Sequence, residues 1–370
     1  MSENLSTLQG QKIKNIRSRV VSVPLKRPIV GKVGSFTKWP LVLIDLETHG
    51  GIVGKSYLEP YVEKLAGSIV GVIDAIAQIF ENKPLGPVDL YDGAMKTLHL
   101  NGREGITLIA QSGIDIAIWD ALAKSVNLPL VSLLGGTPGK IRAYNTNGLW
   151  LIPLDEIGHQ AESLVKEGGF KALKLRLGRE TVAMDKQAIR NIREAVGEDI
   201  LIMTDFNQGF TVSEALQRMH ALDDEGLYWF EEPIVYDDFY NYTHITKKIK
   251  TPIQIGENIY GSRTFQKAVL ARAADMYMPD LMRIGGVTGW MRAAAIAGAS
   301  GSPLSSHLYT PLSAQLLRVS ESADWLEWSD WAEPILEKPF PANNGFAVVD
   351  DTVGNGIEWN ETAVKKYQLK

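Results

Sequence analysis

The chain has 370 residues, 45% of them hydrophobic, with a net charge of −5 and no cysteine. This charge gives no basic surface of the kind that binds nucleic acid or an anionic membrane, so we expect neither partner. Without cysteine, disulfides, thiolate nucleophiles and cysteine-ligated metals are excluded, and any metal must bind oxygen or imidazole. The start of the sequence lacks a signal-peptide core, and no apolar run reaches about 18 residues, so we expect a cytoplasmic protein.

The first part of the chain reads as strands followed by helices. Residues 13–60 alternate or run apolar like antiparallel strands, and Gly50-Gly51 suits a tight hairpin turn. A glycine-rich loop, about residues 30–38, separates the first two strands. Helical periodicity follows over residues 61–135. We therefore predict an α+β domain over residues 1–135.

Strands and helices alternate from about residue 142 onward, as in the strand FKALKLR and the helix TVSEALQRMHALDDEG. This alternation is typical of α/β folds with parallel strands. The length exceeds that of a bare barrel of roughly 250 residues, in line with a second domain. We predict a modified (β/α)₈ barrel over residues 136–335. The last segment, 336–370, is expected to return to the first domain, with VVDDTVGNGIEWN as a hairpin.

Polar residues end successive apolar runs of the predicted barrel at intervals of 20 to 31 residues, about one β/α unit. They are Lys174, Asp205, Glu231, Glu257, Asp280, His307 and Glu327. In a (β/α)₈ barrel, side chains at the carboxyl ends of the strands surround the active site. The spacing therefore predicts one cavity with all seven residues around it.

Three carboxylates on consecutive strands, Asp205, Glu231 and Glu257, offer hard oxygen ligands that suit Mg²⁺, with Mn²⁺ as an alternative. For any one of them, capping of the next helix is an equally good interpretation. Lys174 and Arg176 lie two residues apart and share a strand face. That face points either into the barrel or to a solvated strand edge.

Asp280 precedes His307 by one β/α unit, so the carboxylate can hold one ring nitrogen and leave the other free for proton transfer. Alone, either residue would be assigned a structural role. Asn207 follows Asp205 on the same face. It could contact substrate or a metal-bound water, or cap a helix.

These strings together resemble the mandelate racemase subgroup of the enolase superfamily over nearly the full length: FKALKLR, TDFNQ, FEEP, GEN, PDLMRIGGVTGW, SSHL and WLE. The resemblance implies a capping domain over the barrel and Mg²⁺ on Asp205, Glu231 and Glu257. It also implies proton removal next to a carboxylate, which gives an enolate held by the metal. By the same resemblance, Lys174 contacts the substrate carboxylate, and Asp280 with His307 forms the base. The resemblance also implies that Glu327 hydrogen-bonds the enolate and that loop 30–38 is the mobile loop that selects the substrate. It further implies a homo-oligomer, which in this family is a homo-octamer.

Two residues depart from the mandelate racemase pattern. Arg176 stands where that pattern has a second lysine, the base on the opposite face, and arginine is a poor proton acceptor. Glu59 replaces an aromatic residue of the substrate pocket and favours a polar group there, with Tyr61 and Trp39 available for stacking. We therefore predict dehydration of a sugar acid, with a racemase or epimerase of a 2-hydroxy acid as the alternative. A catalytically silent homologue is the third possibility.

Overall fold

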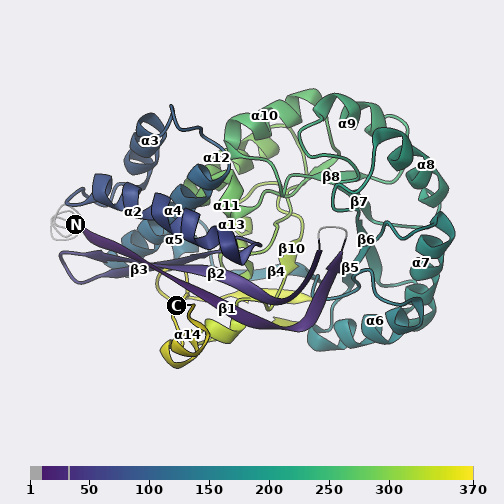
Figure 1. Cartoon of the computed structure of the whole chain (residues 1–370), viewed down its shortest axis with the longest axis horizontal. Coiled ribbons are helices and arrows are strands. Elements are labelled where there is room, and N and C mark those ends of the chain that lie inside the picture. Colours follow the sequence, from purple (N-terminus) through teal and green to yellow (C-terminus); the bar gives the residue numbers. More distant parts are fainter. Residues whose placement is uncertain (1–10, 32–33, 370) are drawn as a thin grey trace.

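The computed structural model describes residues 11–31 and 34–369, and it consists of a strand-and-helix cap beside a barrel (Figure 1). The cap begins with an antiparallel sheet in the order β1 (Ile13–Gly31), β2 (Gly34–Thr48), β3 (Val53–Leu58). Its helices are η1 (Glu63–Leu65), α2 (Ala66–Phe80), α3 (Pro87–Thr97), α4 (Ile106–Ser125) and α5 (Leu130–Leu133). The predicted α+β cap is thus present.

The segment expected to be a loop at 30–38 is largely a β-hairpin, apart from residues 32 and 33, which lie outside the described residues. Ile29 pairs with Phe36 across it, and the backbone N–H of Leu151 donates to the carbonyl oxygen of Val30. The sequence here shows no strand alternation, because Ile29 and Val30 are adjacent and glycines follow them. The hairpin extends from the cap over the barrel (Figure 1).

Helix α4 packs on the sheet and is apolar on nearly all sides. It is the one helix of the described residues long and apolar enough to cross a membrane, but 78% of its most apolar stretch is buried inside the protein. A helix that is hydrophobic all round is what the core of a large protein requires. Gly54 and Gly113 permit this packing, because a Cβ at Gly54 would lie 2.0 Å from the carbonyl oxygen of Ala117.

The barrel strands are short and parallel, and they follow one another in chain order around the sheet. They are β4 (Gly139–Asn145), β5 (Ala172–Arg176), β6 (Leu201–Asp205), β7 (Trp229–Glu231), β8 (Ile253–Ile255), β9 (Met276–Tyr277) and β10 (Leu326–Trp328). Residues 304–307 occupy the position between β9 and β10 through single bridges, and β10 pairs with β4. The predicted modified (β/α)₈ barrel is confirmed.

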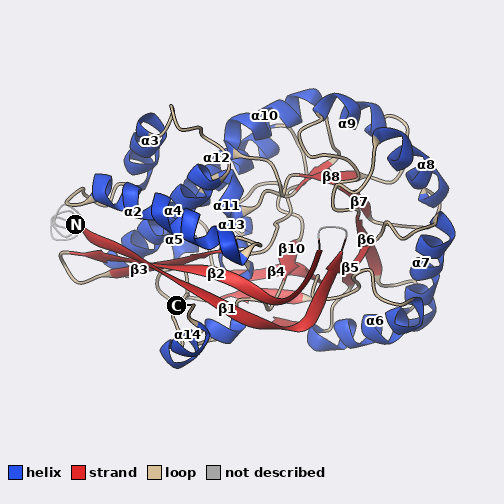
Figure 2. Cartoon of the chain, viewed as in Figure 1, coloured by secondary structure: helices blue, strands red, loops and turns tan. Residues whose placement is uncertain are grey.

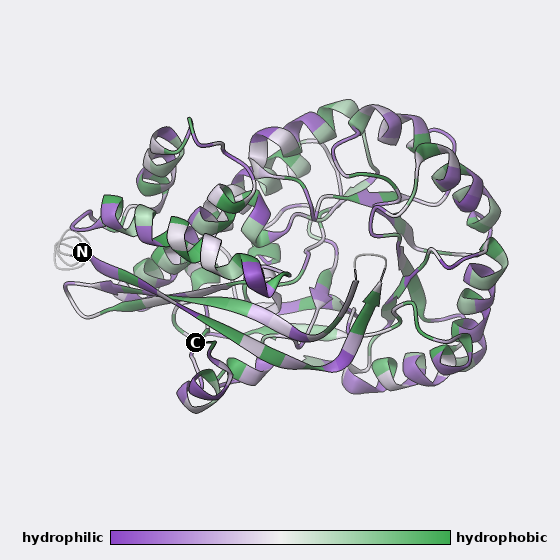
Figure 3. Cartoon of the chain, viewed as in Figure 1, coloured by the Kyte–Doolittle hydropathy of each residue, from purple (hydrophilic) through white to green (hydrophobic). Residues whose placement is uncertain are grey.

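Helices surround these strands on the outside (Figure 2). They are α6 (Leu154–Gly168), α7 (Val182–Val196), α8 (Val212–Leu222), α9 (Phe239–Thr246), α10 (Gly261–Ala271), α11 (Leu281–Ile284), α12 (Gly286–Ala299) and α13 (Thr310–Leu317). Their sequences dictate their ends: Thr211 and Glu214 form a capping box on α8, and α6 stops at Gly169, which has φ +63°. The helices of this ring carry both hydrophilic and hydrophobic residues (Figure 3), as amphipathic helices on a barrel should.

The C-terminal segment contains η2 (Glu333–Ile335), β11 (Ala342–Asn343), β12 (Phe346–Val349) and α14 (Glu361–Tyr367). The hairpin predicted for 348–360 is wrong in position: the hairpin is β11–β12, which pairs with β4. Residues after it do run back along the cap, where the indole N–H of Trp359 donates to Asp45 and Arg19 pairs with Glu361.

A second, smaller core fills the barrel interior beneath its mouth, made by Tyr144, Ala172, Met203, Trp229, Met276 and Trp325. Three of these residues are followed, two positions later on the same strand, by Lys174, Asp205 and Glu231. Because side chains alternate along a strand, these polar residues lie on the inward face of the barrel, one layer above the smaller core. The fold thereby places charge at the mouth and apolar packing below it.

Candidate active site

Seven strand-end residues converge at the barrel mouth, where the sequence predicted them, and all are at least nine-tenths buried: Lys174, Asp205, Glu231, Glu257, Asp280, His307 and Glu327. Carboxylate oxygens of Asp205, Glu231 and Glu257 all lie within 4.8 Å of one another. Burial raises the pKa of Asp205 and of Glu231, because each loses water and faces other carboxylates. Such a cluster fits a divalent cation, which would satisfy the oxygens and offset the repulsion.

Lys174 lies among these carboxylates. Its Nζ is 2.6 Å from Glu327 Oε1, 2.9 Å from Glu231 Oε1 and 3.7 Å from Asp205 Oδ2. Burial lowers the pKa of the lysine, but Glu231 and Glu327 outweigh it and raise the pKa. Burial by itself raises the pKa of Glu327, but the positive charges of Lys174 and His307 outweigh burial and lower this pKa to about 2. Both groups are therefore ionised at neutral pH.

His307 and Asp280 form the hydrogen-bonded pair that the sequence suggested. Nδ1 of the histidine lies 2.7 Å from Asp280 Oδ2, while Nε2 lies 3.0 Å from Glu257 Oε2. The other oxygen of Asp280 accepts the backbone N–H groups of Met282 and Arg283 at the start of α11, which fixes the carboxylate. Burial lowers the pKa of His307, but Glu257, Glu327 and Asp280 raise it overall to about 9.

Arg176 lies at the end of β5 with its guanidinium directed to the loop after β4. Nη1 donates to the carbonyl oxygens of Thr146 and Gly148, at 2.9 and 3.1 Å, and Nη2 donates to Thr146 Oγ1 at 2.7 Å. Its Cζ lies 3.7 Å from the ring centroid of Trp150. The side chain shares the inner face with Lys174, so the solvated-edge alternative is wrong.

A cavity of about 50 Å³ joins these groups to an apolar wall. Its polar end is lined by Lys174, Arg176, Asp205, Asn207, Glu257, His307 and Glu327. Its apolar end is lined by Ile29, Phe36, Trp39, Tyr61, Trp150, Leu308 and Trp331. The cap thus supplies four of the apolar residues and the barrel the remainder.

Trp39 and Tyr61, proposed as substrate contacts, lie side by side in this wall with ring centroids 5.0 Å apart. Glu59 is not among the lining residues; its carboxylate lies behind the wall and accepts the indole N–H of Trp39 at 2.6 Å. The wall of the cavity is therefore aromatic here, and Glu59 does not supply the polar lining that the sequence analysis expected. Burial raises the pKa of Glu59 to about 8.

Asn207 also lines the cavity, and its side-chain amide donates to Asp205 Oδ2 at 2.8 Å. Its φ of +45° is unusual for a residue with a side chain, as are the values for Tyr61 (+60°) and Leu308 (+48°), which line the same cavity. Residues held in sparsely populated conformations cluster at functional sites. Asn207 thus orients the Asp205 carboxylate and does not cap a helix.

The sequence did not single out Trp150, Trp331, Thr146 or Leu308. Trp150 had a usable signal, since it follows the first barrel strand at the carboxyl end, where mouth residues lie. Trp331 and Leu308 are set by the packing of the cap against the barrel, which local patterns do not encode.

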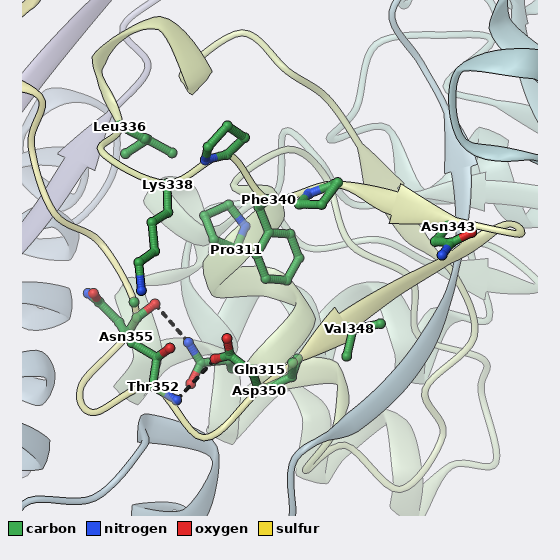
Figure 4. A pocket seen from close by; sticks show the side chains of 14 residues that line it. Pro311, Gln315, Leu336, Lys338, Phe340, Asn343, Val348, Asp350, Thr352 and Asn355 are labelled. Atoms are coloured by element: carbon green, nitrogen blue, oxygen red, sulfur yellow. Dashed lines mark hydrogen bonds between the residues drawn. The ribbon is translucent and has the colours of Figure 1, made fainter.

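A larger cavity, of about 370 Å³, lies beside the C-terminal segment (Figure 4). Lys338, Phe340, Asp350 and Asn355 are among its lining residues, and Gln315 Nε2 donates to the carbonyl oxygen of Asn355. None of its lining residues belongs to the acidic cluster or to the histidine pair. The chemistry is therefore concentrated at the smaller cavity.

Two family models match the chain. The N-terminal domain of mandelate racemase / muconate lactonizing enzyme matches residues 15–135, and the enolase C-terminal domain-like model matches residues 156–363. Arabinonate dehydratase of Saccharolobus solfataricus is 30% identical and covers 89% of this chain and 91% of its own length. Other curated relatives are named as dehydratases, cycloisomerases, racemases and epimerases.

Solved structures are similar over the whole chain. An enolase from the alpha proteobacterium BAL199 with bound magnesium has a TM-score of 0.96 and 45% identity, covering 97% of this chain and all of its own. An enolase from Bradyrhizobium in complex with magnesium and mandelic acid has a TM-score of 0.93 and 36% identity, covering 98% and 99%. The likeness therefore includes the cap, the barrel and the region of the site.

Proposed function

Because the chain belongs to the mandelate racemase / muconate lactonizing enzyme family of the enolase superfamily, we propose that it is a Mg²⁺-dependent enzyme acting on a 2-hydroxy carboxylate. It removes the proton next to the carboxylate and then eliminates water, with a sugar acid as substrate. The proposal rests on His307, which Asp280 holds as the candidate base, and on the fixed side chain of Arg176, which the family resemblance places at the position of a second base.

The metal would be held by Asp205, Glu231 and Glu257, whose carboxylate oxygens all lie within 4.8 Å of one another. When bound, Mg²⁺ would supply positive charge that stabilises the negative charge developing on the substrate. The same charge would offset that of Glu257, which raises the pKa of His307. The hard oxygen donors suit Mg²⁺ and Mn²⁺. Asn207 keeps the Asp205 carboxylate oriented.

His307 acts as the base through Nε2, since Asp280 engages Nδ1 and fixes the ring. The carbon–hydrogen bond at C2 breaks, its electrons enter an enolate, and Nε2 gains the proton. Glu327 is ionised and lies 3.8 Å from Nε2 and 2.6 Å from Lys174 Nζ, so it stabilises the lysine and the imidazolium that forms, and it does not donate a hydrogen bond to the enolate. The bond from C3 to its hydroxyl then breaks. The hydroxide takes a proton from the imidazolium, water leaves, and the enol becomes a 2-keto-3-deoxy acid.

Racemisation needs a proton acceptor on each face of C2. Arginine is a poor proton acceptor because its guanidinium stays protonated, and Arg176 is additionally held by three hydrogen bonds. It therefore cannot take a proton from the second face. Elimination needs only one base.

A second candidate is racemisation or epimerisation of a 2-hydroxy acid with an apolar group. The aromatic wall of Trp39, Tyr61 and Trp331 favours it, because a polyhydroxylated chain would find few polar partners there. The Bradyrhizobium enzyme, which holds mandelic acid, also supports it.

A substrate screen in heavy water separates the candidates. We expect chelation to abolish activity and Mg²⁺ to restore it. Acid sugars should give keto acids, and only one configuration at C2 should exchange its hydrogen for deuterium. Inversion of configuration or exchange from both faces would favour the racemase. Absence of exchange with any 2-hydroxy acid in the presence of Mg²⁺ would identify a silent homologue.

We also propose that the protein is a cytoplasmic homo-oligomer, an octamer if it follows the form that its family resemblance implies. Light scattering coupled to size-exclusion chromatography measures the subunit number directly, and a monomer would contradict the proposal.

A further inference from the structure

Arg176 is a buried cation whose hydrogen bonds all go to neutral groups. Its side chain is 3% exposed, and its two terminal nitrogens bond to two carbonyl oxygens and one hydroxyl. The face of the guanidinium rests on Trp150. Buried charges are ordinarily paired with an opposite charge, and the ion pair that Arg176 forms is a long one, from Nε to Asp205 Oδ2 at 3.9 Å.

The third nitrogen of this guanidinium is left without a partner. Nε is buried and finds no hydrogen-bond acceptor among the described residues. The nearest carboxylate oxygen, Asp205 Oδ2, is 3.9 Å away and accepts from Asn207. Because Arg176 lines the cavity and its remaining nitrogens are fixed, its free N–H belongs to the same polar end. A buried donor of this kind calls for an acceptor that arrives from outside.

Lys174, the neighbouring cation, is in the opposite situation. Its Nζ lies within 4 Å of three carboxylates, two of them closer than 3 Å. Glu327, which is not one of the proposed metal ligands, lies 2.6 Å from Lys174 Nζ, whereas the described residues give Arg176 only a long ion pair with Asp205, at 3.9 Å. Of the two cations on this strand face, Arg176 has the charge available for an incoming anion.

We propose that Arg176 is the side chain that selects for the substrate's negative charge, by donating its Nε–H to an oxygen of the carboxylate. This inference rests on the proposed function, since it takes the substrate to be a carboxylate. It gives Arg176 a role in substrate binding, in addition to its standing where the resemblance has a lysine that acts as a base. A hydrogen bond between two charged groups is about twice as strong as a neutral one.

The competing explanation is that Arg176 only braces the loop at residues 146–150. Arg179 provides a matched control, because it braces the same region without lining the cavity. Its nitrogens donate to the carbonyl oxygens of Arg176, Trp150 and Ile152. Loss of bracing should appear in both arginine variants, and loss of anion binding in only one.

The test compares glycolate with glycolamide, the uncharged amide of the same size, on Mg²⁺-loaded protein by ligand-observed NMR titration. Wild type should bind glycolate more tightly. In Arg176→Gln the glycolate affinity should fall roughly 10- to 100-fold, and the glycolamide affinity by less than about threefold. Arg179→Gln should preserve the preference for the anion. Arg176→Lys should retain part of it, because the charge remains.

Melting temperatures show whether each variant is folded, and Thr146→Val offers a milder change that removes one contact of Arg176 and keeps its charge. Thr146→Val should weaken glycolate binding severalfold with the preference intact. The proposal is overturned if wild type does not prefer glycolate, or if Arg176→Gln keeps the preference while Lys174→Met loses it. These readings involve no turnover, so they stand apart from the exchange experiment that tests the proposed function.

Discussion

At the scale of single residues, the His307–Asp280 pair shows how one carboxylate can serve two structures. One oxygen of Asp280 starts helix α11 and the other holds the imidazole. In the variant Asp280→Asn, the side-chain oxygen can keep the helix contacts while the amide faces Nδ1. Nδ1 must then accept a hydrogen bond from this amide, so the ring proton moves to Nε2. Nε2 can then no longer accept a proton from the substrate.

We therefore expect Asp280→Asn to retain its melting temperature within a few degrees and to lose at least about 100-fold in turnover. The check is the rate of hydrogen exchange at C2 with any accepted substrate. His307→Asn should be at least as impaired. A near-normal rate in Asp280→Asn would show that the pair is not the base.

Glu59 gives a stability prediction with a definite sign. Its pKa is raised from an ordinary 4.5 to about 8, chiefly because burial disfavours the charged carboxylate. Between pH 4.5 and 8 the unfolded chain has lost this proton and the folded protein has kept it, so wild type loses stability as pH rises and levels off above pH 8. Glu59→Gln keeps an acceptor for Trp39 and lacks this slope.

Relative to wild type, Glu59→Gln should thus gain stability from pH 5 to pH 8, by an amount on the order of a few kcal/mol. Denaturant unfolding at several pH values measures the difference. A difference that stays constant with pH would mean that Glu59 is ionised throughout this range.

At the scale of elements, the contact between β3 and α4 decides whether the cap can form. A Cβ on Gly54 would lie 2.0 Å from a backbone oxygen of α4, an atom that cannot move without moving the helix. Gly54→Ala should therefore destabilise the protein by about 1–3 kcal/mol. Gly71 in α2 faces open space, so Gly71→Ala should instead stabilise by about 1 kcal/mol. Thermal unfolding of both variants tests the assignment, and equal effects would contradict it.

The barrel elements and their polar ends could be predicted because each residue at the mouth ends an apolar strand, as Asp205 ends LIMTD and Glu231 ends YWFE. Lys174 and Arg176 followed from strand periodicity alone. The hairpin at 29–36 could not be predicted, since two glycines interrupt its pattern. The position of Glu59 behind Trp39 depends on how the cap packs against the barrel, a long-range contact that local patterns do not encode.

At the scale of the whole molecule, one buried residue ties the C-terminal segment to the cap. Asn355 donates its backbone N–H to Asp120 and its side-chain amide to the carbonyl oxygen of Lys55, and it accepts from Ile357. Asn355→Ala leaves a partly buried carbonyl and a buried N–H without these partners, at a cost of about 1–3 kcal/mol. Asn343, in the same segment, is exposed.

We expect Asn355→Ala to lower the midpoint of denaturant unfolding and to speed proteolysis of the cap, while Asn343→Ala changes neither. Metal binding by the barrel should be unaffected in both, because neither asparagine is near the acidic cluster. Equal stability of the two variants would mean that the segment rests on the cap without supporting it.

The chain also returns to where it began: Arg19 pairs with Glu361, Trp359 bonds to Asp45, and Val21 bridges Gln368. The strands of the cap precede the barrel in the sequence, but the contacts that complete the cap come from residues 359–368, which follow the barrel. The barrel can therefore form while the cap is still unfinished. The aromatic wall is therefore secured only after residues 359–368 have been made, so a chain cut after the barrel would carry the metal ligands without a finished cover over them.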